Sequence, residues 1–259
     1  MSDPARNLGD DEVTEDTFLG GQLRLTQKRS GHRAGHDAIL LAAATAAAAG
    51  DRVVDLGAGV GTAGLALACR VGGITLTLVE IDPELAALAR ANAAANALPA
   101  EAVVLDVTAD AQAFADAGLP PDSVDVVLTN PPFNDPARHR GSPDDARHVA
   151  HVAREETLQA WVHAARRILK SGGALTLIWR ADGIADVLAA LSRGFGSLAI
   201  LPVHGEAGRP AIRVLVRAIK GGKAPTRILP GLMLNASGQP ENEVRDVLTG
   251  RAVLPLAVS

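Results

Sequence analysis

The chain has 259 residues, 47% of them apolar and 21% charged, with a formal net charge of −4 at pH 7. These values suit one domain with a sizeable core, and they argue against a strongly basic protein that binds nucleic acid through its overall charge. The single cysteine, Cys69, excludes an intramolecular disulfide and fits a reducing compartment. The sequence has no secretory leader and no apolar run long enough to span a membrane, so we expect a soluble, cytoplasmic protein.

The first part of the chain differs in character from the rest. Six of the first 16 residues are acidic and one is basic, without periodicity, which predicts a disordered tail over residues 1–16. Two short apolar runs around Gly20-Gly21 predict a hairpin within 17–27. A polar segment then leads to a helix expected over 38–49, which Gly50 ends.

From residue 52 onward, strand-like apolar runs alternate with helical patterns. Pro83 suits the first turn of a helix capped by Asp82. The long polar segment 134–152 is typical of a lid or a binding loop. The expected elements are strands at 52–56, 74–80, 101–106, 123–129, 173–179, 196–204 and 211–219, and helices at 61–70, 83–97, 110–117, 154–169 and 182–192.

This alternation predicts an α/β fold with a parallel sheet covered on both faces. The last two strands are joined by 205–210, which is too short for a crossover helix, so they should be antiparallel. Seven strands with such an ending resemble the class I S-adenosylmethionine-dependent methyltransferase fold, which is Rossmann-like with strand order 3-2-1-4-5-7-6 and strand 7 antiparallel. We expect one domain over 17–259, with an N-terminal extension (17–50), a catalytic core (51–220) and a C-terminal extension (221–259).

A glycine-rich turn follows the first core strand, in the sequence Asp55-Leu56-Gly57-Ala58-Gly59-Val60-Gly61. Its glycines allow a sharp turn and close approach of a ligand to the N–H groups of the next helix. The run Gly59-x-Gly61-x-x-Gly64, with Glu80 21 positions after Gly59, also satisfies the dinucleotide-binding pattern. Spacing alone leaves both ligands open, and Asp55, the final hairpin and a motif at 130–133 favour S-adenosylmethionine.

Several further residues are candidates for binding this methyl donor. Glu80 ends a strand, where its carboxylate can accept both ribose hydroxyls. Ile81 is expected to cover one face of the adenine, and Asp106 to accept from the adenine amino group with Val107 beside it. Asp55 is expected near the methionine amine or the backbone of the turn itself. The alternative for Asp106 is an ordinary turn or cap residue.

The motif Asn130-Pro131-Pro132-Phe133 ends the fourth core strand. The amino group of adenine is a poor nucleophile, because its lone pair is conjugated with the ring. If the Asn130 side-chain oxygen and the Pro131 carbonyl each accept one of its hydrogens, the nitrogen moves toward tetrahedral geometry and its lone pair faces the methyl group. Pro131 and Pro132 stiffen the backbone, and Phe133 is expected to stack on the base.

Three alternatives to this hypothesis stay open. The two prolines are turn formers, so the motif could simply end a strand. A protein glutamine amide, or a planar nitrogen in another RNA or a small molecule, presents the same NH₂ geometry as adenine. A non-catalytic nucleotide-binding scaffold could retain the same fold.

Several segments together resemble the bacterial tRNA1(Val) (adenine(37)-N6)-methyltransferase family, across about residues 17–250. The resemblance implies a tRNA substrate and a segment around Arg33, Gly35 and Asp37 that folds over the donor, with Asp37 near its methionine end. The segments that carry it are the Gly-Gly-x-Leu-x-Leu hairpin, Gly31-x-Arg33-x-Gly35-x-Asp37-x-x-Leu40-Leu41, the glycine turn, the 130–133 motif, Pro202-Val203-His204 and Gly208-Arg209-Pro210-Ala211-x-Arg213-Val214-Leu215-Val216.

Binding of tRNA requires positive charge to neutralise phosphates. Each basic cluster of the sequence fits either an RNA patch or a solvated face. Arg213, like Arg209, could meet phosphate or pair with the sheet edge. No metal site is expected, because the histidines lack a paired helical spacing with an adjacent acid. The clusters are Arg24, Lys28, Arg29, His32 and Arg33; Arg138, His139, Arg140, Arg147 and His148; and Lys220, Lys223 and Arg227.

Overall fold

A computed structural model describes residues 13–29, 35–132, 157–235 and 242–258. Residues 157–168 are helical. The other elements are β1 (Val13–Phe18), η1 (Leu19–Gly21), β2 (Leu23–Lys28), α1 (His36–Ala44), β3 (Arg52–Leu56), α2 (Thr62–Arg70), β4 (Thr75–Glu80), α3 (Pro83–Ala95), β5 (Ala100–Val104), α4 (Ala111–Asp116), β6 (Val124–Thr129), β7 (Leu169–Arg180), η3 (Ala181–Gly183), α6 (Ile184–Leu191), β8 (Phe195–Glu206), β9 (Ala211–Lys220), β10 (Arg227–Ile228), β11 (Leu232–Asn235), α7 (Asn242–Leu248) and η4 (Pro255–Ala257).

The central sheet follows the order β10-β8-β9-β7-β6-β3-β4-β5, with β11 also paired to β8. Counting the core strands from β3 to β9 along the chain, this is the order 3-2-1-4-5-7-6. The pairs from β5 to β7 are parallel, whereas β9 is antiparallel to both β7 and β8. The predicted class I methyltransferase fold is therefore confirmed.

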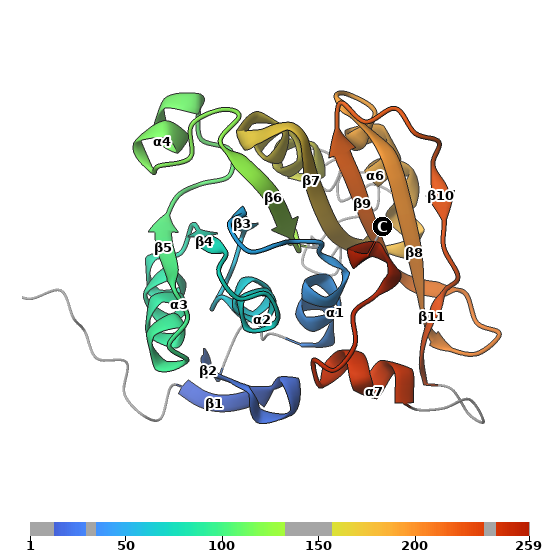
Figure 1. Ribbon diagram of the computed structural model, residues 1–259, viewed down its shortest axis with the longest axis horizontal. Coiled ribbons are helices and arrows are strands. Elements are labelled where there is room, and N and C mark those ends of the chain that lie inside the picture. The colour runs from blue at the N-terminus through green and yellow to red at the C-terminus, as the bar shows by residue number, and fades with distance from the viewer. Residues whose placement is uncertain (1–12, 30–34, 133–156, 236–241, 259) are drawn as a thin grey trace, which may run out of the picture.

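Helices cover both faces of this sheet, as Figure 1 shows. On one face α1, α2 and α3 pack with the N-terminal hairpin and α7 around one apolar cluster. On the other face α4, the helix at 157–168 and α6 surround a second cluster, which contains the fully buried Trp179. Because the central strands β3 and β6 are buried on both faces, they are almost continuously apolar rather than alternating.

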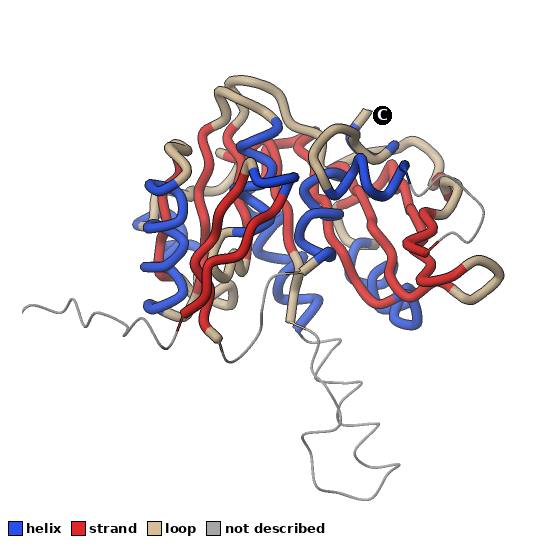
Figure 2. Tube along the Cα trace, turned by 90° about the horizontal axis from the view of Figure 1, so that it is seen from below, coloured by secondary structure: helices blue, strands red, loops and turns tan. Residues whose placement is uncertain are grey.

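The N-terminal hairpin begins earlier than the sequence indicated. Residues 13–16, expected in the disordered tail, form the first part of β1 and pair with residues 25–28 of β2. Their polar side chains are accommodated because β1 is an edge strand, and Asp16 accepts a hydrogen bond from the Gln27 side chain. Figure 2 shows the hairpin lying alongside α3.

The remaining differences are a shorter first helix and two additional strands. The helix expected over 38–49 spans His36–Ala44, because Thr45 is extended and its hydroxyl bonds to the Leu41 carbonyl. The C-terminal extension adds β10 and β11, which both pair in parallel with β8. None of the helices in the described ranges combines the length and apolarity that a membrane crossing requires.

Candidate functional site

The predicted site residues gather where the central parallel strands end. Leu56 of β3 pairs with Thr129 of β6 and with Val79 of β4, and Glu80 pairs with Val104 of β5. The Thr129 hydroxyl also donates to the Leu56 carbonyl at 2.9 Å. The residues that follow these strands, including Gly57 and Asn130, therefore start from neighbouring positions along one edge of the sheet.

The glycine turn has backbone φ angles that residues with a Cβ rarely adopt. Gly57, Gly59 and Gly61 have φ angles of 70°, 57° and 90°. A Cβ on Gly57 would lie 2.1 Å from the Trp161 ring, whereas a Cβ on Gly59 would meet no atom of the described residues within 4 Å. The turn is thus packed against Trp161 at one glycine and open at the next, where a ligand can approach the backbone.

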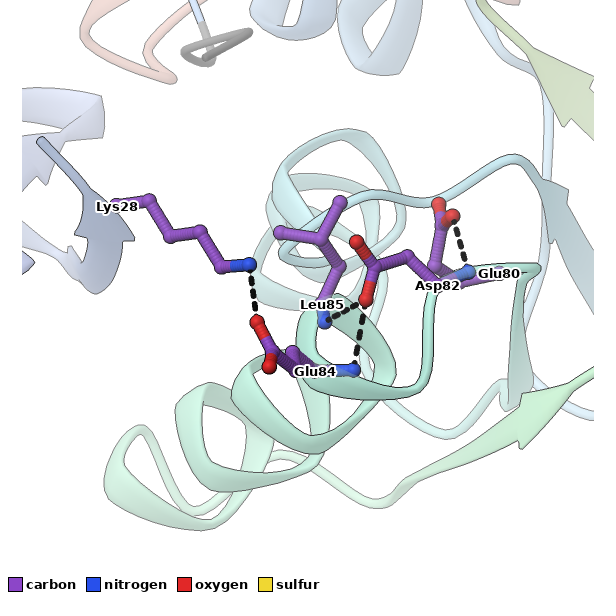
Figure 3. A network of polar contacts seen from close by, with 5 residues as sticks. All are labelled: Lys28, Glu80, Asp82, Glu84 and Leu85. Carbon is purple, nitrogen blue, oxygen red and sulfur yellow. Dashed lines mark hydrogen bonds and ion pairs between the residues drawn. The ribbon is translucent and has the colours of Figure 1, made fainter. Parts of the chain in front are cut away.

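Glu80 fixes the turn from the neighbouring strand. Its Oε2 accepts from the Gly59 N–H at 2.8 Å, and its Oε1 accepts from the Asp82 N–H at 3.0 Å. Figure 3 shows that Asp82 in turn caps α3, and that Glu84 forms an ion pair with Lys28 of the hairpin. Glu80 is only 8% exposed. Its two hydrogen bonds hold the carboxylate in one place, and its oxygens have further lone pairs to offer a ligand.

Asp55 is buried beneath the turn and is 2% exposed. Its Oδ2 accepts from the Gly64 N–H of α2 at 2.8 Å, so it bonds to backbone just past the turn. Burial raises the pKa of Asp55 to about 7; the Gly64 hydrogen bond opposes this shift, and the charge of Glu80 adds to it.

The predicted adenine-binding residues surround the ends of β4 and β5. Ile81 is 59% exposed, which is unusual for isoleucine and leaves an apolar surface next to Glu80. The exposed Asp106 accepts from the Thr108 N–H and hydroxyl, both through Oδ1, so the turn role is present and Oδ2 remains able to accept. Val107 is buried and packs against the core.

Asn130 follows β6 directly, and its Oδ1 is buried and has no hydrogen-bond partner among the residues that the structure describes. Such an atom is costly unless a ligand satisfies it. Pro131 is buried and Pro132 is exposed. Phe133 lies outside the described residues, as does the expected lid at 134–152.

The segment predicted to cover the donor is described in part. Gly35 precedes α1, and Asp37 in its first turn forms an ion pair with Arg213 of β9, with Nε to Oδ2 at 2.9 Å. Arg213 therefore forms an ion pair with α1 within the protein, while Arg209 is exposed. Arg33 lies outside the described residues.

The basic clusters are partly neutralised within the chain. Lys28 pairs with Glu84, and Lys220 pairs with Asp122. Arg29 donates to the Val13 carbonyl, which ties it to the hairpin. These contacts favour a structural role for the two lysines, and the cluster at 138–148 is outside the described residues.

Three residues of the site were missed by sequence reasoning. Thr129 joins the ends of β3 and β6, Trp161 supports Gly57, and Asn92 of α3 bonds to the turn through the Val60 carbonyl at 3.0 Å. Trp161 is partly buried and packs against the second apolar cluster. The one signal for Asn92 was a polar residue on the otherwise alanine-rich buried face of α3.

The arrangement fits an adenosyl ligand. Gly59 leaves open space above a turn whose carboxylate neighbour can accept ribose hydroxyls, and Ile81 and Asp106 present an apolar surface and an acceptor beside it. Asn130 follows the neighbouring strand β6, and its Oδ1, unpaired in the part of the chain that the structure describes, can accept from a second molecule.

Comparisons with known proteins find methyltransferases. Residues 34–202 match the family described as "Methyltransferase small domain". A tRNA1(Val) (adenine(37)-N6)-methyltransferase from Porphyromonas gingivalis is 31% identical over 66% of this chain and 68% of its own length. A release factor glutamine methyltransferase from Chlorobaculum tepidum is 28% identical over 61% of this chain and 55% of its own. The structure of a predicted O-methyltransferase, Atu636 from Agrobacterium tumefaciens, aligns with a TM-score of 0.70 and 34% identity over 84% of this chain and 98% of that one.

Proposed function

Since the chain belongs to the methyltransferase small domain family and uses S-adenosylmethionine, we propose that it methylates the exocyclic N6 nitrogen of an adenine in tRNA. The relative from Porphyromonas gingivalis carries that activity in its name. The observation that carries the proposal is the buried Oδ1 of Asn130, which has no partner within the described ranges and follows directly after β6, the strand beside β3 and its glycine turn.

In this proposal the residues of the acceptor site act on the amino group. The Asn130 Oδ1 accepts one N–H and the Pro131 carbonyl accepts the other, which turns the nitrogen lone pair toward the methyl group. Bound S-adenosylmethionine supplies an electrophilic methyl group on a positively charged sulfur. No strong base is required, because the methylated nitrogen becomes acidic and its proton passes to water or to a carbonyl oxygen.

The donor residues proposed from the sequence act by binding. Glu80 accepts the ribose hydroxyls, Ile81 covers the adenine and Asp106 accepts from its amino group. Asp37 lies toward the methionine end, and Asp55 acts through the backbone of α2, to which it is bonded. Phe133 is proposed to stack on the acceptor base.

The test is methyl transfer to unmodified total tRNA, followed by identification of the modified nucleoside. We expect N6-methyladenosine from the native protein, and a loss of at least about 100-fold in turnover for Asn130→Ala with donor binding retained. The exposed Asn235, at the end of β11, gives the matched control Asn235→Ala, which should remain active. A fully active Asn130→Ala variant contradicts the proposed acceptor site.

A protein glutamine amide is the second candidate substrate, because one relative is named a release factor glutamine methyltransferase. The same two acceptors can bind a carboxamide NH₂, so Asn130→Ala does not distinguish the two substrates. An assay with a labelled methyl donor distinguishes them. If the label is transferred to protein in a cell extract while unmodified tRNA stays unlabelled, the glutamine amide is favoured as the substrate.

A further inference from the structure

Asn92 of α3 connects two parts of the molecule that are far apart in sequence. This residue is only 2% exposed, although its side chain is polar. Its Oδ1 accepts from the Thr26 N–H of β2 at 2.8 Å, and its Nδ2 donates to the Thr26 carbonyl at 3.1 Å and to the Val60 carbonyl at 3.0 Å. One buried carboxamide therefore bonds to both the N-terminal hairpin and the glycine turn.

The turn needs such support because of its composition. Three glycines with positive φ within five residues give a backbone with many accessible conformations in the absence of restraint. Gly57 and Ala58 donate to the Val79 carbonyl, and Gly59 donates to Glu80, so the N–H groups at the start of the turn are fixed from β4. Asn92 fixes the Val60 carbonyl, in the half of the turn that leads into α2.

The nearby Asn96, the C-cap residue directly after α3, offers a comparison. Its Oδ1 accepts from the Arg24 N–H at 3.0 Å, and its Nδ2 donates to the Arg24 carbonyl at 2.6 Å. It binds the hairpin as Asn92 does, two residues earlier along β2, but its other bond goes to the Asn92 carbonyl rather than to the turn. The two asparagines thus share hairpin docking and differ in contact with the turn.

We propose that Asn92 is a positioning residue that couples docking of the N-terminal hairpin to the conformation of the glycine turn, and thereby sets the affinity for the methyl donor. The inference rests on the proposed donor site at this turn. Binding free energies are reciprocal, so the donor must also stabilise the docked hairpin through the same side chain.

The first experiment compares Asn92→Ala with Asn96→Ala. Dissociation constants for S-adenosylhomocysteine are measured by calorimetry, below the unfolding temperatures of both variants. We expect about tenfold weaker binding for Asn92→Ala, equivalent to about 1.4 kcal/mol, and a change within about twofold for Asn96→Ala. The KM for the donor should rise in Asn92→Ala, while kcat at saturating donor is retained.

The second experiment measures hydrogen exchange in residues 23–28 with and without S-adenosylhomocysteine. We expect the ligand to protect this strand in the native protein and in Asn96→Ala, but not in Asn92→Ala. If Asn92→Ala does not fold, Asn92→Ser replaces it in both experiments.

The outcomes separate this inference from the proposed function. A native protein that binds neither S-adenosylmethionine nor S-adenosylhomocysteine refutes the donor site itself. If the native protein binds but the two asparagine variants weaken binding equally, Asn92 acts only by holding the hairpin, and the inference is wrong. The inference is also wrong if Asn92→Ala binds the donor with native affinity.

Discussion

At the scale of single residues, the buried carboxylate of Asp55 should make stability depend on pH. Its pKa is raised to about 7 in the folded protein, well above that of an exposed aspartate. The folded state therefore binds the proton more tightly than the unfolded chain. Protonated Asp55 makes its full contribution to the free energy of unfolding below about pH 4. This contribution, on the order of 4 kcal/mol, is lost as the pH rises to about 7.

Asp55→Asn should remove this dependence, because an amide oxygen can still accept from the Gly64 N–H without carrying a charge. We expect the variant to be more stable than the native protein at pH 8 and similar to it at pH 4. Urea unfolding of the ligand-free protein from pH 4 to 8 measures this, with Asp110→Asn, at the exposed cap of α4, as the control. Parallel pH profiles for native protein and Asp55→Asn contradict the assignment.

The glycines of the turn should differ in their tolerance of alanine. Both Gly57 and Gly59 have positive φ, but a Cβ meets the Trp161 ring only at Gly57. We expect Gly57→Ala to lower the free energy of unfolding by about 2 kcal/mol more than Gly59→Ala does. Chemical denaturation measures both, and adding Trp161→Leu to Gly57→Ala should recover part of the difference. Equal losses at the two glycines would mean that Trp161 does not constrain the turn.

At the scale of elements, the sequence predicted most of the core, and its errors have local causes. Alternating strands and helices predicted the parallel sheet, and the short final loop predicted that β8 and β9 are antiparallel. The strand order came from the resemblance to the class I methyltransferase fold, and the structure has that order. The start of β1 was missed, because its acidic edge-strand sequence lacks the apolar alternation of a buried strand. β10 and β11 were missed because they are short and owe their place to pairing with β8.

Sequence analysis could predict only those residues of the candidate site whose type and position in the sequence indicate a functional role. The glycine turn, Glu80 and Asn130 stand at strand ends, where function concentrates in parallel sheets, so sequence position revealed them. Asn92 and Trp161 act through contacts with residues distant in sequence, Thr26 and Gly57, and no local pattern contains that information. Residues that support a site are therefore harder to predict than residues that form it.

At the scale of the whole molecule, the ion pair between Asp37 and Arg213 joins residues 176 positions apart. It attaches the start of α1 to β9, at the edge where β7 and β9 pair through Arg180 and Arg213. Each side chain is 29% exposed, so the pair is shielded more than a surface ion pair but is still partly screened.

We expect a coupling energy of about 1 kcal/mol between these two residues. The measurement is a double-mutant cycle of Asp37→Asn and Arg213→Gln in urea unfolding. The cycle removes the contribution of Asp37 to the α1 dipole and that of Arg213 to its other contacts, including the Ile212 carbonyl. If the effects of the two substitutions add without coupling, the ion pair does not hold α1 to the final hairpin. The same double-mutant cycle, measured on the dissociation constant of the donor, tests whether the ion pair also supports the site. We expect coupling in binding if the start of α1 lies against the methionine end of the donor, as the family resemblance implies.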